Sequence, residues 1–94
     1  MDAELLLHER HQVSKDSFAE LRIWRISSPV HGSAHLYKYS LAYVVAGQCV
    51  LRYDNEAGKG DHRHFGSEEH SYSFRDPAQL PADFWSDVDD WRKS

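Results

Sequence analysis

The fold is decided by residues 35–54, which read HLYKYSLAYVVAGQCVLRYD. Side chains along a β-strand point to opposite faces in turn, so an alternating pattern predicts a strand with one buried face. Residues 35–45 alternate in this way, and residues 48–54 do so again after a break at Gly47. The segment therefore predicts a β-hairpin at the centre of the molecule.

The register of this hairpin depends on the length of its turn. A two-residue turn at Ala46-Gly47 would set Leu41 against Arg52 and mix the two faces. A three-residue turn over 45–47, with Gly47 in the left-handed conformation, keeps the apolar residues together, so we predict that turn. The predicted pairs are Tyr43 with Cys49, Leu41 with Leu51, Tyr39 with Tyr53 and Lys38 with Asp54. This register also predicts that Cys49 is buried.

Two further strands precede this hairpin, another follows it, and a helix ends the chain. Residues 4–13 and 18–27 are rich in branched and aromatic side chains, and the polar turn between them predicts an N-terminal hairpin. Residues 69–74 alternate and predict a fifth strand. The helix is predicted over 78–92. Its apolar stripe consists of Leu80, Phe84, Val88 and Trp91, with Trp85 at the border.

The residues around the start of the predicted helix indicate how its N-terminus is capped. Asp76 is the predicted N-cap, because a proline follows it and Gln79 completes a capping box. The helical period places Asp83, Asp87 and Asp90 off the apolar stripe, and we expect them in water.

The composition bounds the architecture and the class of protein. Residues 1–94 are expected to form one α+β domain: a twisted, mainly antiparallel sheet of about five strands with the C-terminal helix packed on its apolar face. A single cysteine excludes an internal disulfide framework. The net charge of −4 is unlike that of a dedicated nucleic-acid-binding protein. The N-terminus lacks the pattern of a signal peptide or a membrane span, which favours the cytoplasm.

A polar stretch after the central hairpin holds the candidate site. Residues 53–64 read YDNEAGKGDHRH. Gly58 and Gly60 permit a bent backbone that can approach a ligand closely, and Lys59 between them suits an anion. The stretch is not a Walker loop, because the Lys-Ser/Thr pair and the following helix are missing. A solvated hairpin turn is the alternative interpretation.

The run Asp61-His62-Arg63-His64 indicates a more specific chemistry. In an extended backbone His62 and His64 share one face, and the two residues that alternate with them share the other. Two imidazoles can act as general base and general acid at neutral pH. Lys59 and Arg63 can hold and neutralise a phosphate oxygen. These groups suit metal-independent RNA cleavage, in which the ribose 2′-hydroxyl attacks the adjacent phosphate.

The predicted site extends over neighbouring residues. The predicted catalytic residues are His62, His64 and Tyr53, and the predicted substrate-binding residues are Lys59, Arg63, Asn55, Asp54, Asp61, Gly58 and Gly60. Two other interpretations stay open: solvated or structural histidines, and a metal site in which Asp54 or Asp61 joins the histidine pair. Because no further Cys or His cluster supports a closed tetrahedral site, we predict no metal and no cofactor.

The face of the sheet away from the helix offers a weaker candidate. Arg22, Lys38 and Arg52 are candidates for a shallow basic patch there. An ordinary polar outer face is the preferred interpretation of these residues.

Several motifs together point to a known family. They are Ile23-Trp24-Arg25, Pro29-Val30-x-Gly32-Ser33-x-His35-x-Tyr37-Lys38-Tyr39, Arg52-Tyr53-Asp54-Asn55-x-x-Gly58-Lys59-Gly60-Asp61-His62-Arg63-His64, Tyr72-x-Phe74 and Leu80-x-x-Asp83-Phe84. They resemble the TumE family, and the resemblance implies a growth-inhibiting toxin of a bacterial type II toxin–antitoxin pair. It implies no established reaction. Pro81 departs from the family pattern, where an aliphatic residue is more usual, and predicts a delayed start of the regular helix.

Two functional hypotheses follow from these observations. The leading one is a toxin that acts as a metal-independent endoribonuclease. The alternative is a non-enzymatic protein-binding module that docks an antitoxin or self-associates through Trp85 and Trp91. The resemblance implies a cognate helix-turn-helix antitoxin as the partner; RNA and a second copy of the chain are further candidates, and no membrane is expected.

Overall fold

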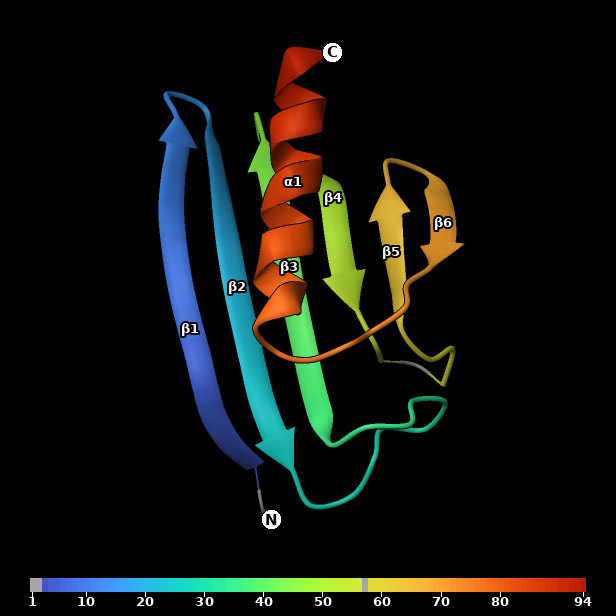
Figure 1. Ribbon diagram of the computed structural model, residues 1–94. Coiled ribbons are helices and arrows are strands. Elements are labelled where there is room, and N and C mark those ends of the chain that lie inside the picture. The colour runs from blue at the N-terminus through green and yellow to red at the C-terminus, as the bar shows by residue number, and fades with distance from the viewer. Residues whose placement is uncertain (1–2, 57) are drawn as a thin grey trace.

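The computed structural model describes residues 3–56 and 58–94, which form six strands and one helix (Figure 1). The strands are β1 (Ala3–Ser14), β2 (Ser17–Ile26), β3 (Tyr37–Val45), β4 (Gln48–Asp54), β5 (His62–Phe65) and β6 (Glu68–Ser71), and the helix is α1 (Gln79–Lys93). Each strand pairs antiparallel with the next one along the chain. The predicted α+β class with a C-terminal helix is therefore confirmed.

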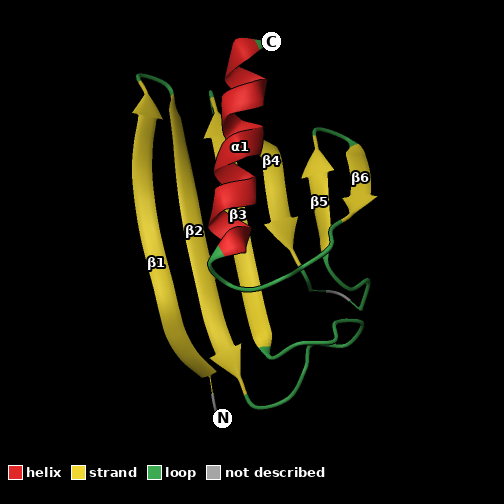
Figure 2. Cartoon of the chain, in the orientation of Figure 1, coloured by secondary structure: helices red, strands yellow, loops and turns green. Residues whose placement is uncertain are grey.

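Helix α1 lies across one face of the sheet, over β3 and β4, which we call the helix-covered face (Figures 1 and 2). The predicted stripe residues Leu80, Phe84 and Val88 are buried there, whereas Trp91 remains 39% exposed. Their partners on the sheet are Leu21, Ile23, Tyr39, Leu41, Tyr43, Leu51 and Tyr53. Burying each large apolar side chain contributes roughly 1.5–3 kcal/mol, so this layer holds the fold together. No element among the described residues covers the other face, which we call the uncovered face.

The central hairpin turns in two residues rather than three, so the predicted turn was wrong. Ala46 and Gly47 both have positive φ angles, of 50° and 79°. The pairing shifts between Tyr43 and Val44, which makes a β-bulge in the hairpin. The bulge restores the match of faces that a regular two-residue turn would lose. The observed pairs are Val44 with Cys49, Tyr43 with Leu51 and Leu41 with Tyr53.

Two further predictions that depended on the three-residue turn were also wrong. Cys49 is exposed, because the bulge moves it out of the apolar row. Lys38 does not pair with Asp54; its Nζ lies 3.4 Å from Glu56 Oε2 instead.

The fifth and sixth strands differ from the predicted single strand over 69–74. Residues 62–65 form β5, and β6 ends at Ser71. The chain then leaves the sheet because its aromatic rings have partners elsewhere. Phe74 stacks on His35 with ring centroids 3.7 Å apart, and Tyr72 packs edge-on against Tyr53.

The predicted N-cap was wrong by two residues: helix α1 begins at Gln79 with Ala78 as its N-cap, and Asp76 caps the turn just before it. Its Oδ1 accepts hydrogen bonds from the backbone N–H groups of Ala78 (2.9 Å) and Gln79 (2.7 Å). The Gln79 side chain does not return to Asp76. It donates to Asp83 Oδ1 at 2.7 Å, so the capping box is only half formed.

The expectation that the helix aspartates lie in water was wrong for two of them. Asp83 accepts a 2.6 Å hydrogen bond from the Tyr72 hydroxyl, and Asp87 lies 3.2 Å from Arg63 Nη1. Both precede a buried stripe residue by one position, which places them at the border of the stripe, above polar groups of the sheet. Only Asp90 is exposed as expected. The described residues include no helix of the length and apolarity that crossing a membrane requires.

Candidate functional site

The pairing of β4 with β5 divides the predicted site between the two faces of the sheet. Asp54 is opposite His62, Arg52 is opposite His64, and Tyr53 is opposite Arg63. Directly opposed residues of an antiparallel pair project to the same face. The uncovered face therefore receives the two histidines with Asp54 and Arg52, as the alternation of 61–64 predicts. Tyr53 and Arg63 project toward the helix and do not meet the histidines.

His62 is held rigidly between two hydrogen-bond acceptors. Its Nδ1 lies 2.9 Å from the carbonyl oxygen of Gly60, and its Nε2 lies 2.7 Å from Asp54 Oδ1. Only a ring that carries a proton on each nitrogen donates to both acceptors at once. The residue is 7% exposed, and a second carboxylate, that of Glu69, lies 3.7 Å from the same Nε2. The position and orientation of this imidazole are thus fixed by its surroundings.

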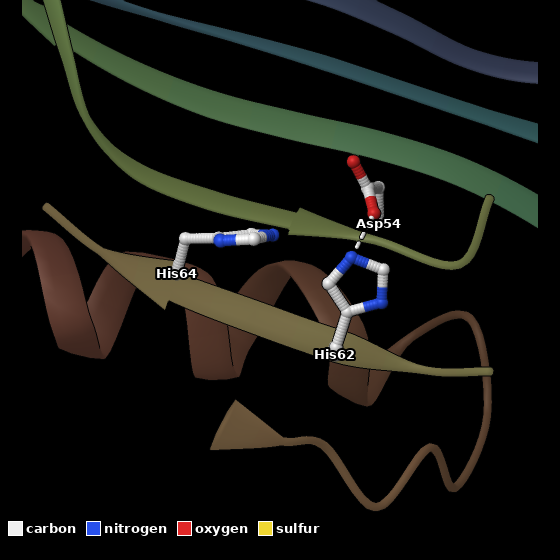
Figure 3. Close-up of side chains that lie close together, drawn as sticks. All are labelled: Asp54, His62 and His64. Atoms are coloured by element: carbon white, nitrogen blue, oxygen red, sulfur yellow. Dashed lines mark ion pairs between the residues drawn. The ribbon is translucent and has the colours of Figure 1, made fainter. Parts of the chain in front are cut away.

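His64 lies beside His62 and is the more accessible of the two. The ring centroids are 4.9 Å apart and the ring planes meet at 80°, and Figure 3 shows both rings on the same side of β5 as Asp54. Within the described residues no hydrogen bond reaches the His64 ring. It lines a surface hollow of about 210 Å³ together with Cys49, Arg52 and Gly66. The His64 residue therefore borders an open space.

Arg52 joins this hollow to a second one. Its side chain is 50% exposed, and its Nε lies 3.9 Å from Asp54 Oδ2. The second hollow, of about 150 Å³, is lined by Glu20, Arg22, Ser40, Ala42 and Arg52. Arg22 is bound to Glu20 at 2.9 Å, whereas the Lys38 ammonium lies over the Trp24 ring. The predicted site did not include Arg52. Arg52 and Asp54 are two positions apart and so share one face of β4. A prediction that β5 pairs with β4 would have placed Arg52 beside the histidines.

The loop that contains Gly58 and Gly60 positions His62 through its backbone. Gly60 has φ of 77°, and a Cβ added there would lie 2.6 Å from the carbonyl oxygen of Gly32, whose own φ is 94°. The close approach that Gly60 permits is therefore to the 27–36 loop, and the fixed carbonyl of Gly60 orients His62. Gly58 is exposed. Lys59 is also exposed, with its Nζ 3.3 Å from Glu69 Oε1.

Two residues predicted to bind substrate serve as internal supports of the loop. Asn55 is fully buried; its Oδ1 accepts from the Tyr39 N–H and its Nδ2 donates to the Tyr37 carbonyl. Asp61 Oδ1 accepts from the Tyr39 hydroxyl at 2.6 Å and lies 2.8 Å from His35 Nε2. Sequence reasoning missed the part played by His35. These hydrogen bonds tie the 53–64 stretch to β3.

Tyr53 and Arg63 form a polar cluster with the helix. The Tyr53 hydroxyl donates to Asp87, and Arg63 Nη1 lies 3.2 Å from Asp87 Oδ2 and 3.3 Å from the Tyr53 oxygen. Burial, and then the hydrogen bond to Asp87, raise the pKa of the Tyr53 hydroxyl well above its usual value. The hydrogen bond to Tyr53 raises the pKa of Arg63. Tyr53 is therefore a neutral donor at physiological pH, and its buried ring is not open to a base.

The groups on the uncovered face support two kinds of chemistry. An accessible imidazole beside a held one can exchange protons with a substrate, and a nearby guanidinium can neutralise a phosphate. One ligand atom from each of Asp54, His62 and His64 also lies within 4.8 Å of the others, a spacing that suits a metal ion. Both options involve His62 and His64.

Comparison with known proteins identifies the family. Residues 2–92 match the family model described as Toxin TumE. The comparison with curated proteins and the comparison with solved structures gave no match. The family match covers almost the whole chain, including both faces of the β4–β5 pair, and confirms the resemblance found in the motifs. The chain therefore belongs to the TumE toxin family.

Proposed function

We propose that this toxin is a metal-independent endoribonuclease whose active centre lies on the uncovered face. The observation that carries the proposal is the adjacency of the His62 and His64 rings, with centroids 4.9 Å apart, next to the exposed guanidinium of Arg52. Family membership supports the toxin function in general. The groups on the uncovered face support this choice of reaction.

His64 is assigned as the general base and His62 as the general acid. His64 faces the hollow and takes the proton from the ribose 2′-hydroxyl as its oxygen bonds to phosphorus. The bond from phosphorus to the 5′ oxygen breaks, and that oxygen receives the Nε2 proton of His62, which leaves its hydrogen bond to Asp54 for this step. The products are a 2′,3′-cyclic phosphate and a 5′-hydroxyl. General acid–base catalysis of this kind contributes roughly 10²–10⁴-fold in rate.

Arg52 is assigned to the scissile phosphate. Arg52 lines both hollows of the uncovered face, so a phosphate bound to it lies next to His64. Lys59 and Arg22, which lie 3.3 Å from Glu69 and 2.9 Å from Glu20, respectively, would exchange these partners for neighbouring phosphates. Charge-assisted hydrogen bonds to phosphate are about twice as strong as neutral ones.

Incubation of the purified chain with single-stranded RNA in the presence of EDTA tests the proposal. We expect cleavage by the parent protein and loss of cleavage in His64→Ala and His62→Ala. The matched control is His70→Ala, because His70 lies on the paired β6, is exposed and lies 3.3 Å from Glu68 Oε1. Thermal unfolding of each variant separates loss of activity from loss of fold. Undiminished cleavage by both variants would remove the two histidines from the mechanism.

A toxin family implies an antitoxin partner, and we propose a helix-turn-helix protein encoded beside this one. A second candidate function, a protein-binding module, is favoured by Trp91, which stays 39% exposed at the end of α1 beside the exposed Asp89 and Asp90. Co-purification of the adjacent gene product with the parent chain and with Trp91→Ala tests this docking. The same variant in size-exclusion chromatography tests self-association. Trp85 is the weaker candidate, since its ring packs on His11 and Phe84.

A further inference from the structure

We infer that Asp54, His62 and His64 form a binding site for one divalent transition-metal ion of the Zn²⁺ type, and that the bound ion inhibits the toxin. The three ligand atoms come from two paired strands and already lie within 4.8 Å of one another. Two imidazole nitrogens and a carboxylate oxygen are a ligand set that zinc accepts. A tetrahedral ion with bonds of about 2.0–2.1 Å holds its ligand atoms roughly 3.3 Å apart, so rotation of the His64 side chain completes the site.

The surroundings of His62 are those of a metal ligand. Metal-bound histidines usually donate the proton of their second nitrogen to a carbonyl or carboxylate, which fixes the tautomer. Here the Gly60 carbonyl lies 2.9 Å from Nδ1, so a proton on Nδ1 leaves the lone pair of Nε2 pointing at Asp54. The ion would replace the proton that Nε2 and the carboxylate share. Because Gly60 is wedged against the backbone of Gly32, this support is rigid.

The fourth position of the site is open to solvent or to Glu69. The hollow beside His64 admits water, and Glu69 Oε2 lies 3.7 Å from His62 Nε2. Two carboxylates and two neutral imidazoles balance the charge of a divalent cation. The site is therefore chemically complete without any rearrangement of the backbone.

The inhibitory part of the inference rests on the proposed function. An imidazole that coordinates a metal through its lone pair neither accepts a proton from a ribose hydroxyl nor delivers one through that nitrogen. An ion at this site would occupy both catalytic histidines together. Metal binding and RNA cleavage are then mutually exclusive states of one set of side chains.

Calorimetric titration of the chelator-treated full chain with ZnCl₂ tests the binding. We expect one ion per chain, a higher thermal unfolding temperature, and affinity lowered at least tenfold in His64→Ala and in Asp54→Asn. Asp54→Asn keeps the shape of the side chain and guards against misfolding. His70→Ala, on the other face of the β5–β6 pair, is the matched control and should bind like the parent. The strong visible absorption of tetrahedral Co²⁺ is a second readout, which loosely bound surface histidines do not produce.

Two results would overturn the site: no stoichiometric binding by the parent chain, or unchanged affinity in both variants. RNA cleavage with EDTA and with one equivalent of Zn²⁺ then tests inhibition, and we expect activity only with EDTA. If Zn²⁺ binds and cleavage requires it, the inhibitory role is wrong. If neither condition gives cleavage, the ribonuclease proposal fails while the calorimetry still decides the metal site.

Discussion

The two faces of the β4–β5 pair carry similar residue types in opposite situations. On the helix-covered face, Arg63 is engaged by Tyr53 and Asp87 beneath α1. On the uncovered face, Arg52 is half exposed and borders two hollows, and the His64 ring faces one of them. Arg63, whose side chain is 35% exposed, is held by Tyr53 and Asp87 and links the helix to the sheet. By contrast, the only acidic contact of Arg52 among the described residues is Asp54, at 3.9 Å. Under the proposed function, position relative to the helix, more than residue type, separates a stabilising arginine from a ligand-binding one.

The largest expected effect on RNA cleavage is that of His64→Gln, on the uncovered face. This substitution removes the exchangeable proton site but keeps a polar side chain of similar length. We expect RNA cleavage to fall by about 100-fold or more, while the free energy of unfolding changes by less than about 0.5 kcal/mol. Cleavage rates and urea unfolding measured on the same preparation check both numbers. Equal losses of activity and stability would show that His64 has a structural role instead.

Asp87→Asn should produce the opposite outcome. The amide gives the Tyr53 hydroxyl and the Arg63 guanidinium a weaker acceptor, so we expect a loss of about 1–2 kcal/mol in the free energy of unfolding. Activity per folded molecule should stay at the parental level. The matched control is Asp90→Asn on the exposed side of the same helix, which should leave urea unfolding unchanged.

Alkaline pH should lower the stability of the fold through the buried tyrosines of the helix-covered face. Burial, followed by hydrogen bonds to Asp61, Asp87 and Asp83 respectively, raises the pKa values of Tyr39, Tyr53 and Tyr72. In the unfolded chain these hydroxyls ionise near pH 10. Their contribution is therefore fully present below pH 10 and is lost as the pH rises above it, by at most about 1.4 kcal/mol per pH unit for each tyrosine.

Thermal unfolding between pH 8 and pH 11 checks this direction. The parent should lose stability above about pH 10. Tyr72→Phe removes one of the three hydroxyls, so its stability should depend less steeply on pH. An unfolding temperature that rises over the same interval would contradict the account.

Arg52→Ala should have the smallest effect of the series. We expect RNA affinity to fall several-fold and the slope of log affinity against log salt to decrease by about one, as for the loss of one phosphate contact. Arg63→Ala, on the opposite face, should leave the salt slope of the folded protein unchanged. Fluorescence anisotropy with an uncleavable 2′-deoxy oligonucleotide measures both slopes. A reduced slope in Arg63→Ala alone would move the RNA to the other face.

The sequence is sufficient to predict much of the fold. Residue types and a polar turn place β1 and β2, alternation places β3 and β4, and the 3.6-residue period places α1 and its stripe from Leu80 to Val88. The turn of the central hairpin could not be predicted, because a β-bulge leaves no mark in the alternation of the sequence. The bulge between Tyr43 and Val44 restores the match of apolar faces that a two-residue turn would otherwise lose. The helix aspartates were misplaced because their partners, Tyr72 and Arg63, come from distant segments.

The candidate site, like the fold, could be predicted only where the local alternation of residues decides the outcome. The sequence places His62 and His64 on one face, which the β5 strand then confirms. It could not show that Asn55 and Asp61 turn inward, because their partners lie on β3 and in the 27–36 loop. Nor could it show that β5 pairs with β4 and so brings Arg52 opposite His64. Contacts between segments that are far apart along the chain decide which polar residues reach the surface.

The histidines of the chain allow the most direct measurement, because they report on both faces. His8, His62 and His64 lie on the uncovered face, whereas His11 packs on Trp85, His35 contacts Asp61 and His70 packs on Phe65. Titration of an uncleavable RNA into protein with ¹³C-labelled histidine rings resolves them by NMR. We predict shifts of the His62 and His64 ring signals with His11, His35 and His70 unmoved. Shifts confined to His11, His35 or His70 would contradict the assignment of function to the uncovered face.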